Sequence, residues 1–355
     1  MIKSSGIGVY IIQLLKPLSA QFSLILLGDP GELAAYKHTA QIISFLTPIY
    51  SIKEQYQLSR LVPRCDIFWS PHYNVPVFPV KAKYRVVTIH DVYHLAFGHD
   101  MGAVKKIYAR FMIGRAVALS KKVITVSNFS KNEIIRYSGC PAEKIQVIYN
   151  GVVQQSPAQT LQILQSKYAL GDKYILFVGN VKPHKNLVVL LKSYLLLDEA
   201  IRNEYQIVVA GKIDGFITGD ETAFDLVNNN SVLKGKVTFT GYVDDKDLGG
   251  LYHHASVFVF PSLYEGFGIP PLEAMTNACP VIASNAASIP EICGEAALYF
   301  QPDDAEGLKK QITSVLSESQ LRGQMINKGL ERAGKFAWQK SAGEHTSLFK
   351  HIISN

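Results

Sequence analysis

Glu265-Gly-Phe-Gly-Ile-Pro-Pro-Leu-Glu273 carries two carboxylates eight positions apart, one in a glycine-rich loop and one beyond two prolines. The apolar run Ser256–Phe260 (SVFVF) precedes this stretch and predicts a buried strand. Pro270 and Pro271 suit the first turn of a helix, because the missing N–H has no partner there. The stretch therefore predicts a strand, a tight loop and a helix of an α/β fold.

The loop and the helix start suit a sugar nucleotide. Gly266 and Gly268 let backbone N–H groups approach a ligand closely, and a helix N-terminus adds partial positive charge. Both features favour a diphosphate. Carboxylates accept hydrogen bonds from hydroxyl groups, so we expect Glu273 to hold the ribose and Glu265 the group beyond the diphosphate.

Composition favours a two-domain cytoplasmic protein. The chain has 355 residues, of which 48% are hydrophobic, and this length suits two domains. We expect no transmembrane helix, since no run of eighteen uncharged apolar residues occurs, and no signal peptide. The four cysteines are scattered without a CxxC pair, which favours reduced thiols over a disulfide framework or a zinc site.

The net charge of +7 is unevenly distributed. Residues 1–150 hold 18 basic and 8 acidic side chains, whereas residues 151–355 hold 18 and 21. The basic half suits anionic lipid or an acidic glycan acceptor. Nucleic acid is not expected as a partner, because no basic run with interleaved aromatic residues is present.

Short apolar runs alternate with helix-periodic stretches throughout the chain, which is the doubly wound α/β pattern. Predicted strands include Phe22–Leu27, Tyr84–Ile89, Val123–Val126, Tyr174–Val178, Gln206–Ala210 and Val237–Thr240. Predicted helices include Gly102–Ser120, Asn128–Tyr137, Leu187–Leu197 and Asp244–His254. The pattern occurs twice, on either side of a turn-rich linker, and predicts domains over 1–155 and 156–336 with a last helix in 337–355.

Residues 258–284 (FVFPSLYEGFGIPPLEAMTNACPVIAS) resemble the donor-site block of the family 4 retaining glycosyltransferases, whose E-x7-E motif matches Glu265 and Glu273. The resemblance implies the GT-B fold, in which two Rossmann-like domains face a cleft and the last helix crosses back to the first domain. It implies a hexosyltransferase that uses neither a metal nor a cofactor besides its nucleotide-sugar donor. Similarity to mannosyltransferase-like members favours GDP-mannose, although users of UDP- and ADP-sugars share this loop. The implied acceptor is a glycan or lipid-linked glycan of the cell envelope.

The resemblance also implies donor-binding residues in the second domain. Lys185 matches the family lysine that binds the diphosphate, and many relatives carry an arginine where Asn180 stands here. Lys182 is expected to replace that charge. Lys212, after the strand IVVA, is expected to face the nucleotide, and the loop residues of the donor site are Gly266, Phe267 and Gly268. The alternative for each lysine is a solvated loop position.

Two positions of the first domain match the family as well. His90 follows the strand YRVVTI and resembles the histidine that contacts the donor sugar near its reacting carbon. Gly8, in Gly6-Ile7-Gly8, matches a loop that closes over donor and acceptor. The structural alternatives are a strand-end hydrogen-bond donor for His90 and a helix-start glycine for Gly8.

Other features have weaker functional readings. Asp245-Lys246-Asp247 has the spacing of a metal motif, but its place at a helix start favours capping and no metal is expected. A Rossmann oxidoreductase would need a third glycine where Ile11 stands. A noncatalytic binding subunit is the remaining alternative, and it would be expected to lack Glu265 or Lys185.

Two further expectations concern the first domain. The segment Met1–Ser5 is too short and polar for a buried strand, so the central first strand of the sheet is expected to be missing, through an upstream start or truncation. A basic and apolar helical stretch predicts weak, salt-sensitive contact with the inner face of an anionic membrane, against the simpler reading of a solvated helix face. Its residues are Lys105, Lys106, Arg110 and Arg115 with Ile107, Phe111 and Met112.

Overall fold

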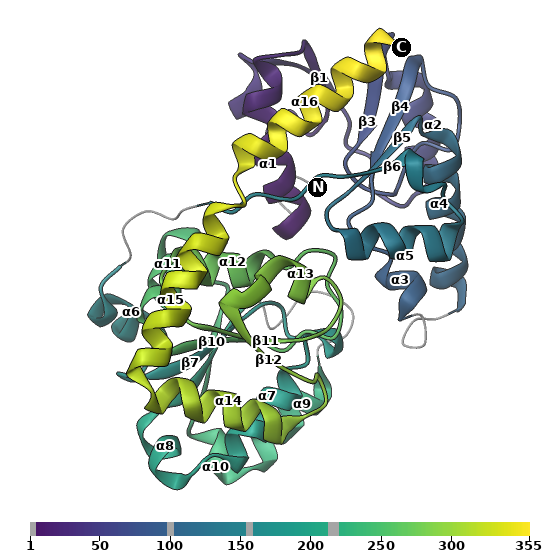
Figure 1. The fold of residues 1–355 in the computed structure, drawn as a ribbon. Helices are drawn as coiled ribbons and strands as arrows, with labels where there is room; N and C mark the ends of the chain where they lie inside the picture. Colours follow the sequence, from purple (N-terminus) through teal and green to yellow (C-terminus); the bar gives the residue numbers. More distant parts are fainter. Residues whose placement is uncertain (1–4, 98–102, 154–158, 212–219) are drawn as a thin grey trace. The chain divides into compact units, whose positions relative to one another are not determined.

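The computed structural model describes residues 5–97, 103–153, 159–211 and 220–355 (Figure 1). The chain divides into two units. Unit 1 comprises residues 1–151 and 337–355, and unit 2 comprises residues 152–336. The predicted boundary at residue 155 lies outside the described residues. Within the described part, no helix is long and apolar enough to span a bilayer.

Unit 2 contains one six-stranded sheet with the order β12-β11-β10-β7-β8-β9, in which every neighbouring pair is parallel. The chain runs outward from β7 to β9 and then returns to the other side of β7 as β10. The strand order therefore reverses between β7 and β10, where open α/β sheets bind ligands at the strand carboxyl ends. The strands are β7 (Tyr174–Val178), β8 (Gln206–Ala210), β9 (Val237–Gly241), β10 (Val257–Phe260), β11 (Val281–Ser284) and β12 (Ala297–Phe300).

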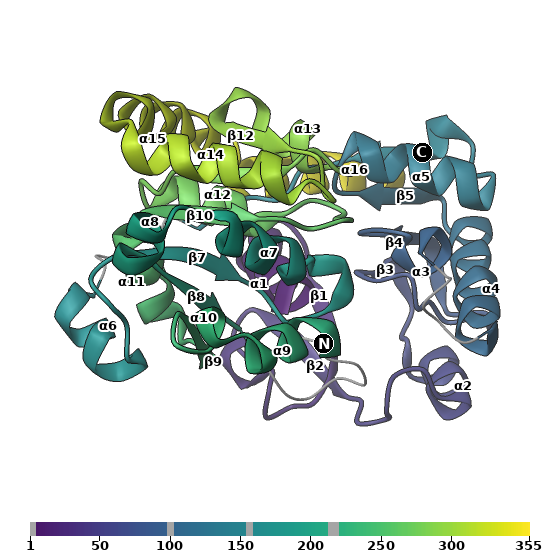
Figure 2. The same ribbon diagram turned by 90° about the horizontal axis from the view of Figure 1, so that it is seen from below.

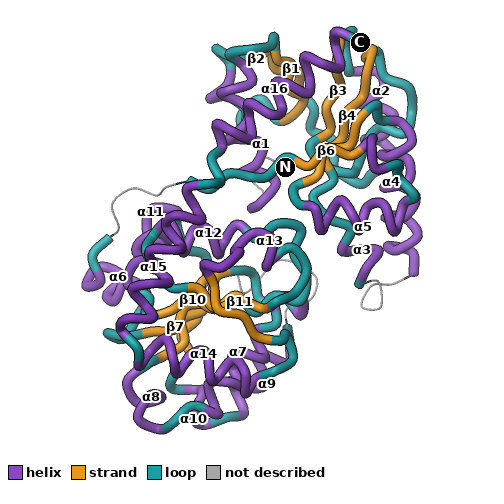
Figure 3. The backbone as a smooth tube through the Cα atoms, in the orientation of Figure 1, coloured by secondary structure: helices purple, strands orange, loops and turns teal. Residues whose placement is uncertain are grey.

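Helices cover both faces of this sheet (Figure 3). Leu190 of α7 and Ile312 of α14 pack with Ile207 and Val259 of the strands in one fully buried cluster. On the other face, α12 packs against α11 and α15. The helices are α6 (Leu161–Tyr168), α7 (Leu187–Leu196), α8 (Glu199–Glu204), α9 (Glu221–Asn229), α10 (Ser231–Lys234), α11 (Asp245–His254), α12 (Ile269–Thr276), α13 (Ile289–Cys293), α14 (Ala305–Ser317) and α15 (Ser319–Gly334).

The strands of unit 1 form two separate parallel sheets, β1-β2 and β3-β4-β5-β6 (Figure 2). The strands are β1 (Leu24–Gly28), β2 (Ala40–Ser44), β3 (Cys65–Ser70), β4 (Ala82–Thr88), β5 (Lys122–Thr125) and β6 (Ile145–Val147). The helices are α1 (Ser5–Ser19), α2 (Ile52–Leu61), α3 (Tyr93–Ala96), α4 (Ala103–Leu119), α5 (Asn128–Ser138) and α16 (Trp338–Ser354).

The four-stranded sheet lies between two helical layers. Tyr10 and Leu14 of α1 pack with Phe349 of α16 and Val86 of β4 on one face. On the other face, Met112 of α4 joins a second cluster made with β4, β5 and α5. The helix at the end of the chain thus belongs to the core of unit 1.

The division of the unit 1 sheet falls where a central strand was expected to be missing. In the order 3-2-1-4-5 that strand would separate β1 from β3. Here β1 and β3 lie in different sheets, and every residue of β1 is only partly buried. The described chain opens with α1, and residues 1–4 lie outside the description. Gly6 and Gly8 form the start of α1, which corrects the prediction of a loop before the helix.

The chain passes between the units twice, at residues 151–152 and at residues 336–337. Within each unit, these two segments contact each other. In unit 1, Gly151 packs so closely on Trp338 that an added Cβ would lie 2.2 Å from its backbone nitrogen, so only glycine fits. In unit 2, the N–H of Val152 donates to the carbonyl of Phe336 at 3.0 Å.

Candidate functional site

The loops after β7 and β10 meet at the point where the strand order of unit 2 reverses. The N–H of Leu263 donates to the carbonyl of His184 at 2.8 Å. The side-chain amide of Asn186 donates to the carbonyls of Pro261 at 3.1 Å and Pro302 at 2.7 Å. Asn186 itself has a left-handed backbone, with φ at 57°. Both predicted donor-binding loops are therefore held in one place by contacts between main chain and side chain.

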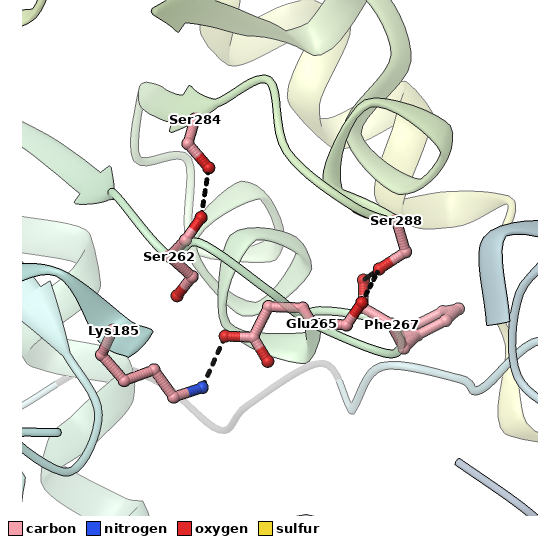
Figure 4. Close-up of polar contacts among 6 residues, drawn as sticks. All are labelled: Lys185, Ser262, Glu265, Phe267, Ser284 and Ser288. Carbon is pink, nitrogen blue, oxygen red and sulfur yellow. Dashed lines mark hydrogen bonds and ion pairs between the residues drawn. The ribbon is translucent and has the colours of Figure 1, made fainter. Parts of the chain in front are cut away.

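Lys185 and Glu265 form an ion pair in this place (Figure 4). Lys185 Nζ lies 2.5 Å from Glu265 Oε1, and both side chains are mostly buried. Lys182 is near, since desolvation and the charge of Lys185 together lower its pKa. The structure thus brings together three side chains that were predicted from separate motifs, with two ammonium groups and one carboxylate.

Serines that the sequence analysis missed fix the glycine loop (Figure 4). The hydroxyl of Ser288 donates to the carbonyls of Glu265 at 2.9 Å and Phe267 at 3.1 Å. The hydroxyl of Ser284 donates to the carbonyl of Ser262 at 2.5 Å. Ser288 precedes a helix that carries Pro290, which is the pattern of a helix cap, yet its hydroxyl binds the loop instead. The loop thus has a defined backbone before any ligand binds.

The predicted helix after the loop is confirmed as α12, with Gly268 at its N-cap in a left-handed conformation of φ 92°. Glu273 lies within α12, and its Oε2 accepts a hydrogen bond of 3.0 Å from the hydroxyl of Tyr252. Burial raises the pKa of Glu273 to about 7, with a smaller contribution from the charge of Asp245. Tyr252 is fully buried, and no local pattern in the chain predicted its contact with Glu273.

Unit 1 places His90 directly beyond β4. Its Nε2 lies 3.0 Å from the carbonyl oxygen of Pro71, and its ring meets the ring of Tyr10 edge to face at 4.8 Å. The hydroxyl of Tyr10 lies 3.1 Å from Thr88 Oγ1 and 2.7 Å from His345 Nε2. Burial lowers the pKa of His90, which therefore stays neutral near pH 7. Tyr10 of α1 thus packs against the His90 ring, and its hydroxyl is held by Thr88 and by His345 of α16.

The remaining candidates are less directly placed. Gly8 is a buried residue of α1, and Lys212 lies outside the described residues. An added Cβ on Gly211 would lie 2.1 Å from the carbonyl oxygen of Gly179, so the loops after β7 and β8 require glycine there.

Asp247 does not cap α11 but binds Lys167 and the hydroxyl of Tyr168, which ties α11 to α6. Within the described residues no three His, Cys, Asp or Glu side chains form a metal-binding group.

Comparisons with known proteins agree with this geometry. A family described as "Glycosyl transferases group 1" matches residues 161–332, and one described as "Glycosyltransferase Family 4" matches residues 4–155. An O-antigen chain mannosyltransferase B of Escherichia coli is 32% identical over 286 residues, which are 78% of this chain and 74% of that protein.

Two further matches differ in what they cover. The serotype-specific mannosyltransferase WbdA of Escherichia coli is 30% identical over 238 residues, but this chain spans only 29% of that protein. The structure of Anabaena HepE in complex with UDP-glucose aligns with a TM-score of 0.78 at 17% identity, over 100% of this chain and 97% of that one. The structural match establishes a shared GT-B fold. Together with the sequence matches, it shows that this chain belongs to the group 1 glycosyltransferases.

Proposed function

We propose that the chain transfers mannose from GDP-mannose, with retention of configuration, to a glycan or lipid-linked acceptor of the cell envelope. The Lys185–Glu265 pair beside the glycine loop carries the proposal, because it joins a phosphate-binding cation to a hydroxyl-binding carboxylate. The printed names of the relatives support mannose and an O-antigen-like product.

The donor half of the mechanism is electrostatic. When the nucleoside diphosphate leaves, negative charge develops on its terminal phosphate, and Lys185 with the loop N–H groups stabilises that charge without reorganisation. Phosphate and Glu265 compete for Lys185, so donor binding would free the carboxylate for the sugar hydroxyls. Glu273 would hold the ribose hydroxyls from α12.

The transfer step exchanges one C–O bond for another. The acceptor hydroxyl oxygen attacks the anomeric carbon on the face of the leaving group, the bond to the phosphate oxygen breaks, and that phosphate takes the acceptor proton. His90, kept neutral by burial, would contact the sugar near this carbon. No metal and no cofactor enters the step.

Nucleotide binding and product analysis test the proposal. Wild-type protein is expected to bind GDP in calorimetry and to turn over GDP-mannose in preference to UDP- and ADP-sugars. Lys185→Ala removes transition-state charge stabilisation, so kcat/KM should fall by about 10²–10³-fold. Lys173→Ala is the control, since Lys173 makes an exposed pair with Glu204 away from the donor loops and should leave kcat/KM unchanged.

The outcomes separate the alternatives. Equal loss in both lysine variants would place the donor site elsewhere. GDP binding without transfer or hydrolysis of any nucleotide sugar would indicate a noncatalytic binding subunit. A preference for a UDP-sugar would support the proposed glycosyltransferase activity but contradict GDP-mannose as its donor.

We also propose a peripheral membrane contact through α4. Its exposed apolar side chains are Val104, Ile107 and Phe111, with exposed fractions of 81%, 69% and 55%. The exposed bases Lys105, Lys106 and Arg110 accompany them. Met112, which was predicted to belong to this membrane-contacting stretch, is buried in the core, and this corrects that part of the prediction. The Arg115 guanidinium contacts the carbonyl of Val77. The exposed mixture of apolar and basic groups fits an anionic bilayer surface.

Liposome flotation tests this contact. Wild-type protein should float with vesicles that contain phosphatidylglycerol at low salt and should be released at high salt. Ile107→Ser combined with Phe111→Ser should reduce binding by about tenfold, because both apolar side chains would leave the interface. Binding that is absent at low salt, or equal in the double variant, would leave α4 as a solvated helix.

A further inference from the structure

We propose that an aromatic cluster beside His90 is a hexopyranose-binding subsite, which holds the sugar ring of the acceptor. The cluster comprises the rings of Tyr50, His72, Tyr73 and Tyr108 with the polar side chains of Glu54 and Asn74. The inference rests on the proposed function, because an acceptor sugar is required only if the chain is a transferase.

The rings form a continuous wall in unit 1. The centroid of Tyr50 lies 6.2 Å from that of His72 and 6.1 Å from that of Tyr108, with near-perpendicular planes in both pairs. His72 lies against Tyr73, with a centroid distance of 4.1 Å. Tyr73 is buried, whereas Tyr50 is 49% exposed. The wall therefore has a fixed base and an exposed aromatic edge.

Polar groups are fixed at the side of this wall. The carboxylate of Glu54 accepts hydrogen bonds from the N–H of Tyr50 at 2.6 Å and from the amide of Asn74 at 2.9 Å. The amide oxygen of Asn74 accepts the hydroxyl of Tyr108 at 3.1 Å. Glu54 is only 4% exposed, and burial raises the pKa of its carboxyl, while the hydrogen bonds from Asn74 and Tyr50 oppose that rise. The network orders the polar groups and the rings together.

The backbone of Tyr50 adds an independent sign of function. Its φ of 66° is in the left-handed region, which a bulky residue rarely adopts. The bond from its N–H to Glu54 holds this conformation. Such strain persists where the surroundings impose it, and it concentrates at ligand sites.

The cluster adjoins the candidate reaction centre of unit 1. His90 Nε2 lies 3.0 Å from the carbonyl oxygen of Pro71, the residue before His72. This contact places the His90 ring against the backbone that leads directly into His72. A sugar on the ring wall would therefore lie near the histidine that is proposed to face the reacting carbon.

The chemistry of the cluster favours a neutral sugar over an anion. A hexopyranose has an apolar C–H face that packs on aromatic rings and a rim of hydroxyls that bind amides and carboxylates. Glu54 would repel a phosphate, and burial keeps His72 uncharged by lowering its pKa to about 3. The combination of ring faces, one carboxylate and one amide matches such a hexose ring.

Saturation-transfer NMR tests the subsite with methyl α-D-pyranosides of mannose, glucose, galactose and N-acetylglucosamine as probes. At least one probe should receive magnetisation from the wild-type protein on its ring C–H protons. Tyr50→Leu should lower the affinity of the protein for that probe about tenfold, as expected for loss of an aromatic contact. Tyr56→Leu is the matched control, because Tyr56 is also 49% exposed but its ring lies under Arg60.

A second variant guards against a folding defect. Tyr108→Phe keeps the ring and removes only the hydroxyl that binds Asn74, so probe binding should weaken about threefold with unchanged thermal stability. No probe binding in the wild type, or equal weakening in Tyr50→Leu and Tyr56→Leu, would overturn the subsite. GDP calorimetry distinguishes the two proposals: intact GDP binding with failed probe binding rejects only the subsite, whereas failed GDP binding rejects the proposed donor.

Discussion

The two units carry the same type of sheet in different states of burial. In unit 2 the strands β10 and β11 are buried at every residue, and hydrogen bonds between neighbours join all six strands into one sheet. In unit 1 the sheet is divided, and β1 is partly exposed throughout. Unit 2 thus holds its loops on a continuous sheet. The other unit relies on helices α1 and α16 and on buried polar contacts to hold His90.

The units also bury different titratable groups. Unit 1 buries imidazoles whose pKa values are lowered by desolvation, to about 4 at His345 and about 3 at His72. Unit 2 buries the carboxyl of Glu273, whose pKa is raised to about 7. The same physical cause, loss of water around a charge, shifts the pKa values of buried imidazoles and buried carboxyls in opposite directions. Unit 1 also buries the carboxyl of Glu54, whose pKa is likewise raised, so its response to acid combines both kinds of group.

Matched leucine truncations should give the largest difference between the units. Leu176 in β7 is fully buried, so Leu176→Ala should lower the free energy of unfolding by about 3–5 kcal/mol. Leu26 in β1 is partly exposed, so Leu26→Ala should cost about 1 kcal/mol. Urea unfolding followed by far-UV circular dichroism measures both. Equal costs would show that β1 lies in a filled core and would remove the contrast.

Acid should change the stability of the two units differently, by less than the difference between the two leucine variants. The unfolded histidine has a pKa of 6.5 and His345 in the fold about 4, so unit 1 loses stability as the pH falls through this window, by about 1–3 kcal/mol. The raised pKa of Glu273 opposes folding above pH 7, and this effect disappears as the pH falls towards 4.5. Both tryptophans, Trp69 and Trp338, lie in unit 1, so their fluorescence reports that unit alone.

The control for the acid experiment is hydrogen exchange read separately from peptides of the two units. Between pH 7 and pH 5, after correction for the intrinsic rate, unit 1 peptides should lose protection and unit 2 peptides should keep it. Loss of protection in unit 2 first would contradict the assignment of the buried histidines as the acid-sensitive groups.

The smallest expected effect concerns the hydrogen bond between Tyr252 and Glu273. Tyr252→Phe removes a hydrogen bond worth about 1 kcal/mol, so GDP affinity should fall about fivefold while kcat changes little. That bond lowers the pKa of Glu273, so the variant should shift the pH dependence of GDP binding upward. Tyr194→Phe is the control, since its buried hydroxyl binds only backbone carbonyls among the described residues. Equal effects in both variants would indicate a general loss of stability.

Local signals in the sequence predicted much of unit 2. The strand Tyr174–Val178 matches β7 residue for residue, and the glycine and prolines before Glu273 predicted the start of α12. Such features depend on neighbours in the chain, so a motif contains them. The hydroxyls of Ser288 and Tyr252 act on residues about twenty positions away, and only the fold brings them there.

Two errors of the sequence analysis fall in unit 1 and have a common cause. Met112 was predicted to belong to the same membrane-contacting stretch as Ile107, but five residues turn a helix by about 140°, and Met112 packs in the core. Gly6 and Gly8 predicted a loop, yet the packing of α1 through Tyr10 and Leu14 outweighs the weak helix propensity of glycine. In both cases tertiary packing determines the result: it buries the Met112 side chain and makes Gly6 and Gly8 helical.

The paired connections at Gly151–Trp338 and Val152–Phe336 have a topological consequence. Unit 2 is an insertion within unit 1, because its first and last residues are hydrogen-bonded neighbours and the chain returns to the point where it left. Domains whose ends meet tolerate excision and circular permutation. We therefore expect that residues 152–336 can be expressed alone, and that Gly151 can be joined to Ala337 by a short linker to close the remainder.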